Sequence, residues 1–488
     1  TVGHYPRASG MMSDSRGDAA FRQRVDYVID ELKACQRDGL VCGFPDGATQ
    51  LENSLSGKPF VGVPWYTMHK IFAGLRDARA TDVLVSLTDW LDRAARNVPL
   101  QPMLAREHGG MCEVLADVHA LTGEQKYLAL AERFVHQDFL KPLAAARDTL
   151  DGLHSNTQIP KVIGLARLHE LAGTPSYSEA ASFFWQRVVM RRSFATGGNG
   201  DLEHFFPPFE FPERLQSAKT METCCAHNML RLTRQLFLQN PDVAFADYYE
   251  RALYNCILAS QDPDSGMMTY FQATRPGYLK LYCTPTDSFW CCTGSGMENH
   301  AKYGDSIYFH DADSLYVSLF IASELTWREK GLRVTQTTKF PEEGATRLAI
   351  HATRPTRLSM KIRHPSWCDV ATISVNGRET RSRRPGSYVE IERTWRDGDV
   401  VEVALPMQRH LEPLPTAPEF VAVMRGPIVL AGRMGTKGLT PGADIIVNER
   451  TSGDMLNEPM DIPALTSERE LVPYYRIAHE RYNLYWRL

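Results

Sequence analysis

The stretch SIYFHDADSLYVSLF, residues 306–320, is the point at which the hydrophobic pattern of the chain changes its period. Before it, apolar residues recur every three or four positions, as expected of amphipathic helices. After it, short runs rich in β-branched and aromatic residues alternate with Gly, Pro, Asn and Asp, as expected of strands and turns. The sequence therefore predicts a helical domain over residues 1–305 and a β domain over residues 306–488.

The helical half consists of consecutive helical patterns joined by short polar links. DAAFRQRVDYVIDELKACQ, residues 18–36, carries an apolar stripe, and pairs such as Thr122-Gly123 give the ending expected of a helix. Comparable patterns occupy residues 65–78, 83–97, 110–121, 124–135, 157–172, 176–190, 221–239 and 243–259. Because each helix must bury its stripe against others, we expect the array to close on itself as a helical toroid.

The β half is predicted to form an antiparallel β-sandwich. Asn376-Gly377 and Asp397-Gly398 are typical hairpin turns, and residues 420–432, FVAVMRGPIVLAG, read as a strand pair broken at the Gly-Pro step. Residues 439–488 are rich in Pro, Asp and Glu, and we expect them to wrap across both domains.

The composition excludes several classes of protein. Lys and Arg (54) nearly balance Asp and Glu (58), so no basic surface for nucleic acid is expected. No apolar run is long enough for a membrane span, and ten cysteines are too few in 488 residues for a disulfide scaffold. We expect a soluble protein of the bacterial periplasm or cytoplasm, with the compartment left open. The chain starts TVGHYP without methionine, which leaves open whether an export segment or a structured piece precedes it.

Two cysteine pairs suggest a metal site. Glu222, Cys224 and the adjacent Cys291 and Cys292 would together give zinc a four-ligand shell of one carboxylate and three thiolates. Adjacent cysteines bind one metal only where the backbone turns both side chains to the same side, and we expect Thr293-Gly294-Ser295-Gly296 to form an irregular loop that does so. Ordinary buried thiols are the alternative.

Polar residues gather at the starts of several predicted helices, in VPWYTMHK (63–70), REHGGMCE (106–113) and LHSNTQIPK (153–161). In a toroid of antiparallel helices alternate starts face one rim, so these residues could converge on a pocket suited to a sugar. Helix caps and turn residues are the alternative for each segment.

ATGGNGDLEHFFPPFEF, residues 195–211, contains a candidate acid. A carboxyl group in a partly apolar pocket has a raised pKa and can protonate a leaving oxygen, and Glu203 lies between a glycine-rich loop and aromatic residues. A solvated loop glutamate is the alternative.

Seven segments in this order resemble the β-L-arabinofuranosidases of glycoside hydrolase families 127 and 146, and the second more closely. The segments are GHY (3–5), HKIFAGLRDA (69–78), EHGGMCEVLADV (107–118), GLHSNTQIPKVIG (152–164), GGNGDLEHF (197–205), METCCAHNMLRLTRQLF (221–237) and WCCTGSGMENHAKYGDSIYF (290–309). The resemblance covers residues 1–320 and is only architectural beyond them.

The resemblance implies a fold, an activity and a site. Such enzymes have an (α/α)6 barrel followed by a β-sandwich, and release terminal β-L-arabinofuranose from plant-type oligosaccharides or glycoconjugates by exo-action with retention. It implies Cys291 as nucleophile and Glu203 as acid/base. The implied zinc ligands are Glu222, Cys224, Cys291 and Cys292, and the implied sugar-binding residues are His69, His108, His154 and Tyr270. Cys225, beside a ligand, leaves the exact ligand set open.

Two other functions are weighed beside this one. An inverting helical-toroid glycosidase would use carboxylates alone, Asp117 and Glu203 first, with a structural zinc. A non-catalytic glycan-binding protein would use the sandwich as its binding module. A thiol redox role lacks the C-x-x-C motif that it requires. We also consider a homodimer, since sandwich surfaces often pair subunits.

Overall fold

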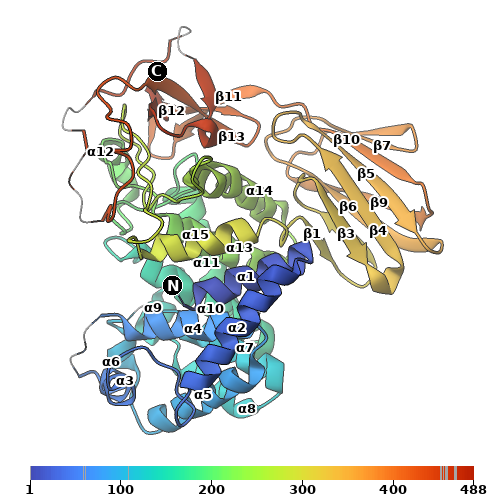
Figure 1. Ribbon diagram of the computed structural model, residues 1–488. Coiled ribbons are helices and arrows are strands. Elements are labelled where there is room, and N and C mark those ends of the chain that lie inside the picture. The colour runs from blue at the N-terminus through green and yellow to red at the C-terminus, as the bar shows by residue number, and fades with distance from the viewer. Residues whose placement is uncertain are drawn as a thin grey trace.

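The computed structural model describes residues 2–58, 60, 62–107, 109–450, 453, 455–456, 460–466 and 470–488. Its helical part precedes its β part, and the β part forms three sheets (Figure 1). Among the described residues, no helix has the length and apolar character needed to span a bilayer. The sugar-binding residue predicted at position 108 lies outside the described residues.

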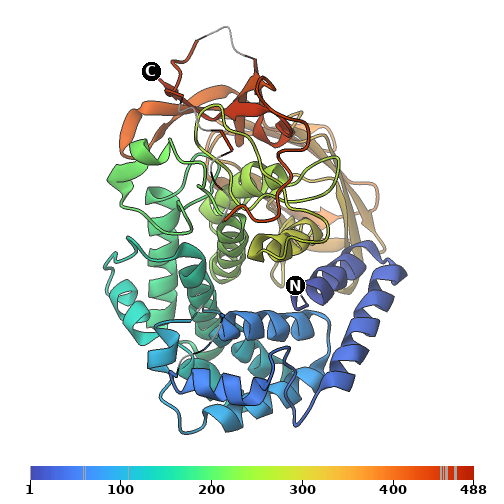
Figure 2. The same cartoon turned by 60° about the vertical axis from the view of Figure 1, so that its left-hand side comes forward.

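Six helices form a closed ring, in which each packs on the next and the last packs on the first (Figure 2). They are α1 (His4–Arg16), α4 (Pro64–Asp77), α7 (Met111–Thr122), α10 (Ser155–Ala172), α13 (Thr223–Gln239) and α15 (Cys291–Ala301). An outer helix packs on each of the first five: α2 (Ala19–Cys35), α5 (Thr81–Ala95), α8 (Gln125–Arg133), α11 (Pro175–Arg191) and α14 (Val243–Ala252). The predicted helical barrel is confirmed.

Short helices lie in the connections of both the helical and the β part. They are α3 (Gly47–Leu55), α6 (Gln101–Leu104), α9 (Gln137–Ala144), α12 (Phe211–Arg214), η1 (Pro208–Glu210), η2 (Leu253–Ile257), η3 (Leu258–Ser260), η4 (Arg328–Lys330) and η5 (Tyr474–Arg476).

The predicted irregular loop after Cys292 is wrong, because residues 293–296 lie inside helix α15. Their glycines serve close packing. A Cβ atom on Gly294 would lie 2.3 Å from the ring of His4 in α1, and one on Gly296 would lie 2.6 Å from Met268. Glycine allows α15 to approach its neighbours at these two points, at a cost in helix propensity that packing offsets.

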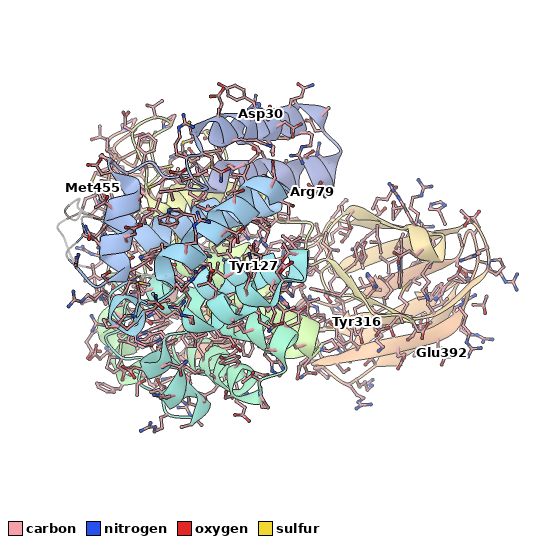
Figure 3. The ribbon with its side chains drawn as sticks, turned by 90° about the horizontal axis from the view of Figure 1, so that it is seen from below. Asp30, Arg79, Tyr127, Tyr316, Glu392 and Met455 are labelled. Carbon is pink, nitrogen blue, oxygen red and sulfur yellow. The ribbon has the colours of Figure 1, made fainter. Side chains whose placement is uncertain are left out.

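Two sheets face one another as a sandwich beside the ring. One has the strand order β1 (Tyr308–His310), β2 (Ser314–Val317), β6 (Thr356–His364), β9 (Ser387–Trp395); the other has β3 (Ser323–Trp327), β4 (Leu332–Thr338), β5 (Ala345–Ala352), β10 (Val400–Ala404), β7 (Ala371–Val375), β8 (Arg378–Ser382). Their inner faces share one apolar core that includes Val334, Ile350, Met360 and Trp395. Tyr316 lies on the side of the sandwich that packs on the helices, and Glu392 lies farther out (Figure 3).

The sandwich departs from the sequence prediction at two points. Strand β2 pairs with β6 in parallel, whereas every other strand pairing described is antiparallel. Asn376-Gly377 does form the β7–β8 hairpin turn, but Asp397-Gly398 joins strands of different sheets, since β9 pairs with β6 and β10 pairs with β5 and β7. A tight turn with glycine in the left-handed region serves a crossover between sheets as well as a hairpin.

A third sheet holds the C-terminal residues against the helical part. Its strands are β11 (Arg409–Leu414), β12 (Ala417–Arg425), β13 (Ile428–Gly435), β14 (Leu471–Pro473), β15 (Arg481–Asn483) and β16 (Tyr485–Arg487), and β12 and β13 form the strand pair predicted at residues 420–432. Val429 and Tyr485 pack with Phe194 and Phe211, which precede α13. The loops of the helical part are thereby held between the ring and the C-terminal sheet.

Candidate active site

The four residues predicted to bind metal meet at one mouth of the ring. Glu222 immediately precedes α13, Cys224 lies in its first turn, and Cys291 and Cys292 begin α15. The sulfurs of Cys224 and Cys292 are 3.3 Å apart, those of Cys291 and Cys292 are 3.8 Å apart, and Cys291 Sγ lies 3.4 Å from Glu222 Oε1. The four donor atoms lie within 4.8 Å of one another, so this cluster could hold a metal ion.

The protonation of the cluster depends on its burial. Burial, followed by the charges of its neighbours, raises the pKa of Glu222 well above its usual value, and burial likewise raises the pKa values of Cys224 and Cys292. Hydrogen bonds from Cys224 and Cys292 instead lower the pKa of Cys291. The N-terminus of α15 adds a partial positive charge beside the same sulfur. Cys291 is therefore the group of this cluster that most readily becomes a thiolate.

Cys225 points away from the cluster. Its sulfur lies 2.9 Å from Ser155 Oγ and 3.4 Å from the second oxygen of Glu222. Cys225 thus contacts the proposed ligand Glu222 on the side away from the cluster, between α13 and α10.

Glu203 lies on a strained turn close to the cysteines. Leu202 and Glu203 both have positive φ, 46° and 69°. Such conformations are costly for non-glycine residues and persist where neighbours impose them. Here Ser155 does so, because its backbone N–H and its hydroxyl both donate to the Glu203 carbonyl, at 2.7 and 2.9 Å.

The carboxylate of Glu203 is surrounded by donors. Tyr270 donates its hydroxyl to Oε1, while His154 Nε2 and Arg450 Nη2 lie 3.4 and 3.2 Å from Oε2. Burial raises the pKa of Glu203, but the contacts from His154, Tyr270 and Arg450 outweigh it and lower the pKa below its usual value. The expectation of a raised pKa is therefore wrong, because polar donors and not apolar walls surround this carboxylate.

The histidines predicted to bind sugar differ in exposure. His154 is partly exposed and lies beside Glu203. His69 is 1% exposed, and neither of its ring nitrogens has a hydrogen-bond partner among the described residues; Glu113 Oε2 is 3.7 Å away. Burial lowers the pKa of His69 to about 3, so its ring is neutral.

A cavity of about 380 Å³ opens beside Cys291. Its lining includes the aromatic side chains of Phe44, Tyr66 and Trp290. An aromatic-lined cavity beside polar groups is typical of a site for a small ring compound.

Glu298 fixes the position of helix α15, which carries Cys291 and Cys292. Its carboxylate, 1% exposed, is 2.8 Å from Arg7 Nη1 and 3.3 Å from His227 Nε2, and it contacts His4. These contacts join α15 to α1 and α13. A buried carboxylate with several partners fixes orientation because each lost partner would leave charge uncompensated.

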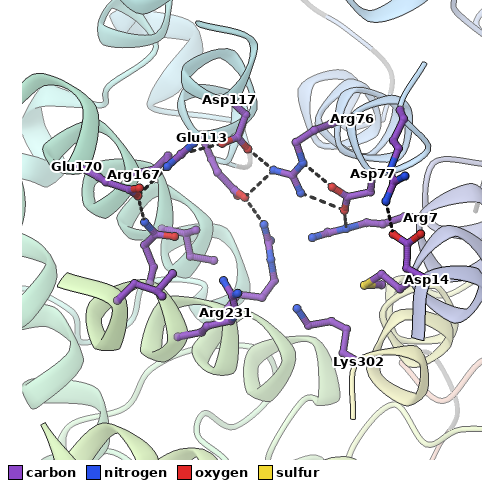
Figure 4. Close-up of a pocket in the computed structure, with 16 residues that line it drawn as sticks. Arg7, Asp14, Arg76, Asp77, Glu113, Asp117, Arg167, Glu170, Arg231 and Lys302 are labelled. Atoms are coloured by element: carbon purple, nitrogen blue, oxygen red, sulfur yellow. Dashed lines mark hydrogen bonds and ion pairs between the residues drawn. The ribbon is translucent and has the colours of Figure 1, made fainter. Parts of the chain in front are cut away.

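The opposite mouth of the ring holds a charged cavity of about 530 Å³, lined by residues of α1, α4, α7, α10 and α13 and by Lys302, which directly follows α15 (Figure 4). Asp117 lies there. It pairs with Arg76 and, at 2.7 Å, with Arg167, while Glu113 joins Arg76 to Arg231. Asp117 is therefore separated from Glu203 along the axis of the ring, and it faces arginines.

The family of the chain follows from comparison with known sequences. The profile described as the β-L-arabinofuranosidase GH127 catalytic domain matches residues 1–305, and that of the GH127 middle domain matches residues 314–407. The chain belongs to glycoside hydrolase family 127. The closer likeness to family 146 stays a prediction.

Three proteins named as β-arabinofuranosidases are 19–24% identical to this chain. A non-reducing end β-L-arabinofuranosidase of Bifidobacterium longum subsp. longum is 24% identical over 370 residues, which are 64% of this chain and 55% of that protein. The chain thus spans about half the length of this curated relative. A crystal structure of a GH127 β-L-arabinofuranosidase from Geobacillus stearothermophilus T6 is 19% identical, with a TM-score of 0.76 over 100% of this chain and 89% of that one. A GH127 β-arabinofuranosidase structure is 24% identical, with a TM-score of 0.72 over 89% and 75%. These structures share the fold of this chain.

Two residues at this site, Arg450 and Glu298, could not be assigned a role from the sequence. Arg450 follows Glu203 by more than two hundred positions and belongs to no recognised motif. Glu298 lies within the matched segment 290–309, but only the packing of three helices reveals its role.

Proposed function

We propose that this family 127 chain is an exo-acting, retaining β-L-arabinofuranosidase with Cys291 as nucleophile and Glu203 as acid/base. The observation that carries the proposal is that one phenol oxygen, that of Tyr270, contacts both groups. Retaining glycosidases place their two reacting groups about 5 Å apart. Two groups that contact the same hydroxyl oxygen lie close to one another, which supports this pairing. The name of the Bifidobacterium relative supports β-L-arabinofuranose at a non-reducing end as the substrate.

Zinc is the metal that the cluster fits best. Two sulfurs at the usual zinc–sulfur distance from one tetrahedral ion lie about 3.8 Å apart. The sulfur separations here, 3.3 and 3.8 Å, are close to that value. Three thiolates and one carboxylate also suit zinc by their chemistry. Glu222, Cys224, Cys291 and Cys292 would hold the ion, which when bound keeps thiols deprotonated at neutral pH.

The reaction would proceed in two displacements. The Cys291 thiolate attacks the anomeric carbon while Glu203 gives its proton to the departing glycosidic oxygen, so the carbon–oxygen bond breaks as a carbon–sulfur bond forms. The Glu203 carboxylate then removes a proton from water, and this water displaces the sulfur. Two inversions at one carbon give retention of configuration.

Four residues are proposed to bind the sugar: His69, His108, His154 and Tyr270. The support for His69 is its neutral, buried ring with two unpaired nitrogens, since a buried polar group without a partner is costly unless a ligand supplies one. The support for His154 and Tyr270 is their contact with Glu203.

The alternatives fit the contacts less well. A carboxylate-only mechanism through Asp117 would need that side chain near Glu203, whereas it pairs with arginines at the opposite mouth. A purely glycan-binding role does not account for a partly exposed cysteine that shares one tyrosine hydroxyl with a buried carboxylate. The plant-type glycan, a homodimer and a bacterial compartment stay predictions.

Turnover of p-nitrophenyl β-L-arabinofuranoside by three proteins tests the proposal: wild type, Cys291→Ala and Asp117→Asn. We expect turnover by wild type, loss of at least about a thousandfold in Cys291→Ala, and near-normal rates in Asp117→Asn. Robust turnover by Cys291→Ala would overturn the nucleophile, and loss in Asp117→Asn with its fold intact would favour the carboxylate mechanism. Absence of wild-type turnover would overturn the function itself.

A further inference from the structure

Residues 444–450, DIIVNER, form a strap that crosses from the C-terminal part of the chain onto the loops of the candidate site. The backbone of Tyr282 pairs with the strap on both sides: its N–H donates to the Asp444 carbonyl at 2.7 Å, and its carbonyl accepts from Ile446 N–H at 2.8 Å. The side chain of Ile446 packs against the apolar cluster that contains Cys224 and Cys292.

The middle of the strap is bonded to the residues just before α15. The Val447 carbonyl accepts hydrogen bonds from Ser288 Oγ at 2.9 Å and from Trp290 Nε1 at 2.6 Å. Since Trp290 directly precedes Cys291, the strap fixes the backbone that presents the proposed nucleophile.

Glu449 ties the strap to the other side of the site. Its side chain is 2% exposed, and Oε2 accepts from the backbone N–H groups of Tyr270 and Phe271 at 3.1 and 3.3 Å. The strap is thus attached both to the cysteine helix and to the tyrosine that contacts Cys291 and Glu203.

Arg450 ends the strap at Glu203. Its Nη2 lies 3.2 Å from Glu203 Oε2, and its carbonyl accepts from Lys219 Nζ at 3.2 Å. The Arg450 side chain is 62% exposed, whereas that of Glu203 is 7% exposed. Arg450 therefore covers the solvent side of the Glu203 carboxylate.

We propose that Arg450, which the strap places beside Glu203, is a positioning residue for this acid/base. It holds Glu203 toward the glycosidic oxygen, on the leaving-group side of the site. This inference rests on the proposed function. In the first displacement Glu203 loses its proton and becomes an anion, and the guanidinium beside it stabilises that anion while Tyr270 holds the other oxygen. The strap lies outside both matched regions, 1–305 and 314–407, so this contribution is not part of either domain.

Leaving-group dependence separates this role from a merely structural one. A p-nitrophenolate departs with little protonation, whereas a sugar hydroxyl needs the acid. In the full-length chain, we expect Arg450→Ala to lower kcat/KM about 10- to 100-fold for an arabinofuranosyl disaccharide, and less than about threefold for the nitrophenyl glycoside. Arg450→Lys should recover part of the loss. Arg433→Ala is the matched control, because Arg433 is also an exposed arginine paired with a glutamate, Glu480, and it lies on β13.

The outcomes separate the role of Arg450 from the proposed function. Equal loss on both substrates, or no loss on either by an active enzyme, would overturn the role of Arg450 and leave the proposed function standing. Absence of wild-type turnover on both substrates would overturn the proposed function, and this role with it. A double-mutant cycle on Tm with Arg450→Ala and Glu203→Gln tests the contact without turnover, and additive effects would contradict it.

Discussion

The hydroxyl of Tyr270 lies 3.5 Å from the sulfur of Cys291. The same hydroxyl donates a hydrogen bond to Glu203, so it joins the proposed nucleophile to the proposed acid/base. The backbone N–H of Tyr270 is in turn bonded to Glu449 of the strap. One side chain thereby sets the separation of the two reacting groups.

Tyr270→Phe should lower kcat about 10- to 1000-fold while the metal content stays unchanged. The phenol oxygen is not a proposed metal ligand, but its loss removes the donor to Glu203 and the oxygen that contacts the sulfur of Cys291. Steady-state kinetics together with metal analysis of the purified variant would check this. Unchanged kcat would show that the hydroxyl is dispensable.

Cys224 and Cys225 are adjacent, yet only Cys224 belongs to the cluster. The Cys224→Ala variant should no longer bind one metal ion per chain. The Cys225→Ala variant should keep its metal, and its free energy of unfolding should fall by about 1 kcal/mol because the substitution leaves a cavity beside Ser155. Elemental analysis and Tm would distinguish the two variants. Metal loss in Cys225→Ala would mean that the ligand set is wrong.

Metal binding should release protons. In the metal-free protein, burial raises the pKa values of Glu222, Cys224 and Cys292, so these groups hold protons that a metal must displace, about three per ion. Because metal competes with protons, zinc affinity should rise as the pH rises from 6 to 8. Chelator competition at several pH values gives the measurement. A pH-independent affinity would contradict the proposed protonation of the cluster.

Gly294→Ala should destabilise the ring by about 1–3 kcal/mol, because the new methyl group would overlap the His4 ring and push α15 from α1. Gly304→Ala is the control, since a Cβ atom there meets nothing within 4 Å. Thermal unfolding of both variants would test this, and equal Tm values would contradict the close packing of the two helices.

The sequence predicts the long helices well where an apolar stripe exists. The pattern over residues 18–36 corresponds to α2, Ala19–Cys35, within one residue at each end. Helix α1, HYPRASGMMSDSR, has no such stripe and was not predicted. It is stabilised by long-range pairs, such as Arg7 with Glu298, that no local pattern reveals.

The site was predictable where its residues lie in recognised motifs, and not where a contacting residue belongs to no motif. Glu222, Cys224, Cys291 and Cys292 come together as the sequence predicted. The surroundings of Glu203 could not be anticipated, because Arg450 reaches it through the strap and depends on the docking of the third sheet. The predicted rise in the pKa of Glu203 is wrong because His154, Tyr270 and Arg450, which come from three separate segments, outweigh the effect of burial.

Peptide mapping by mass spectrometry after rapid quenching, with Glu203→Gln and p-nitrophenyl β-L-arabinofuranoside, tests the central claim most directly. This variant can form the intermediate from an activated leaving group but cannot activate water to remove it. We predict one pentosyl group attached to Cys291. A pentosyl group on a carboxylate, or turnover without any adduct and with inverted product, would contradict a cysteine nucleophile.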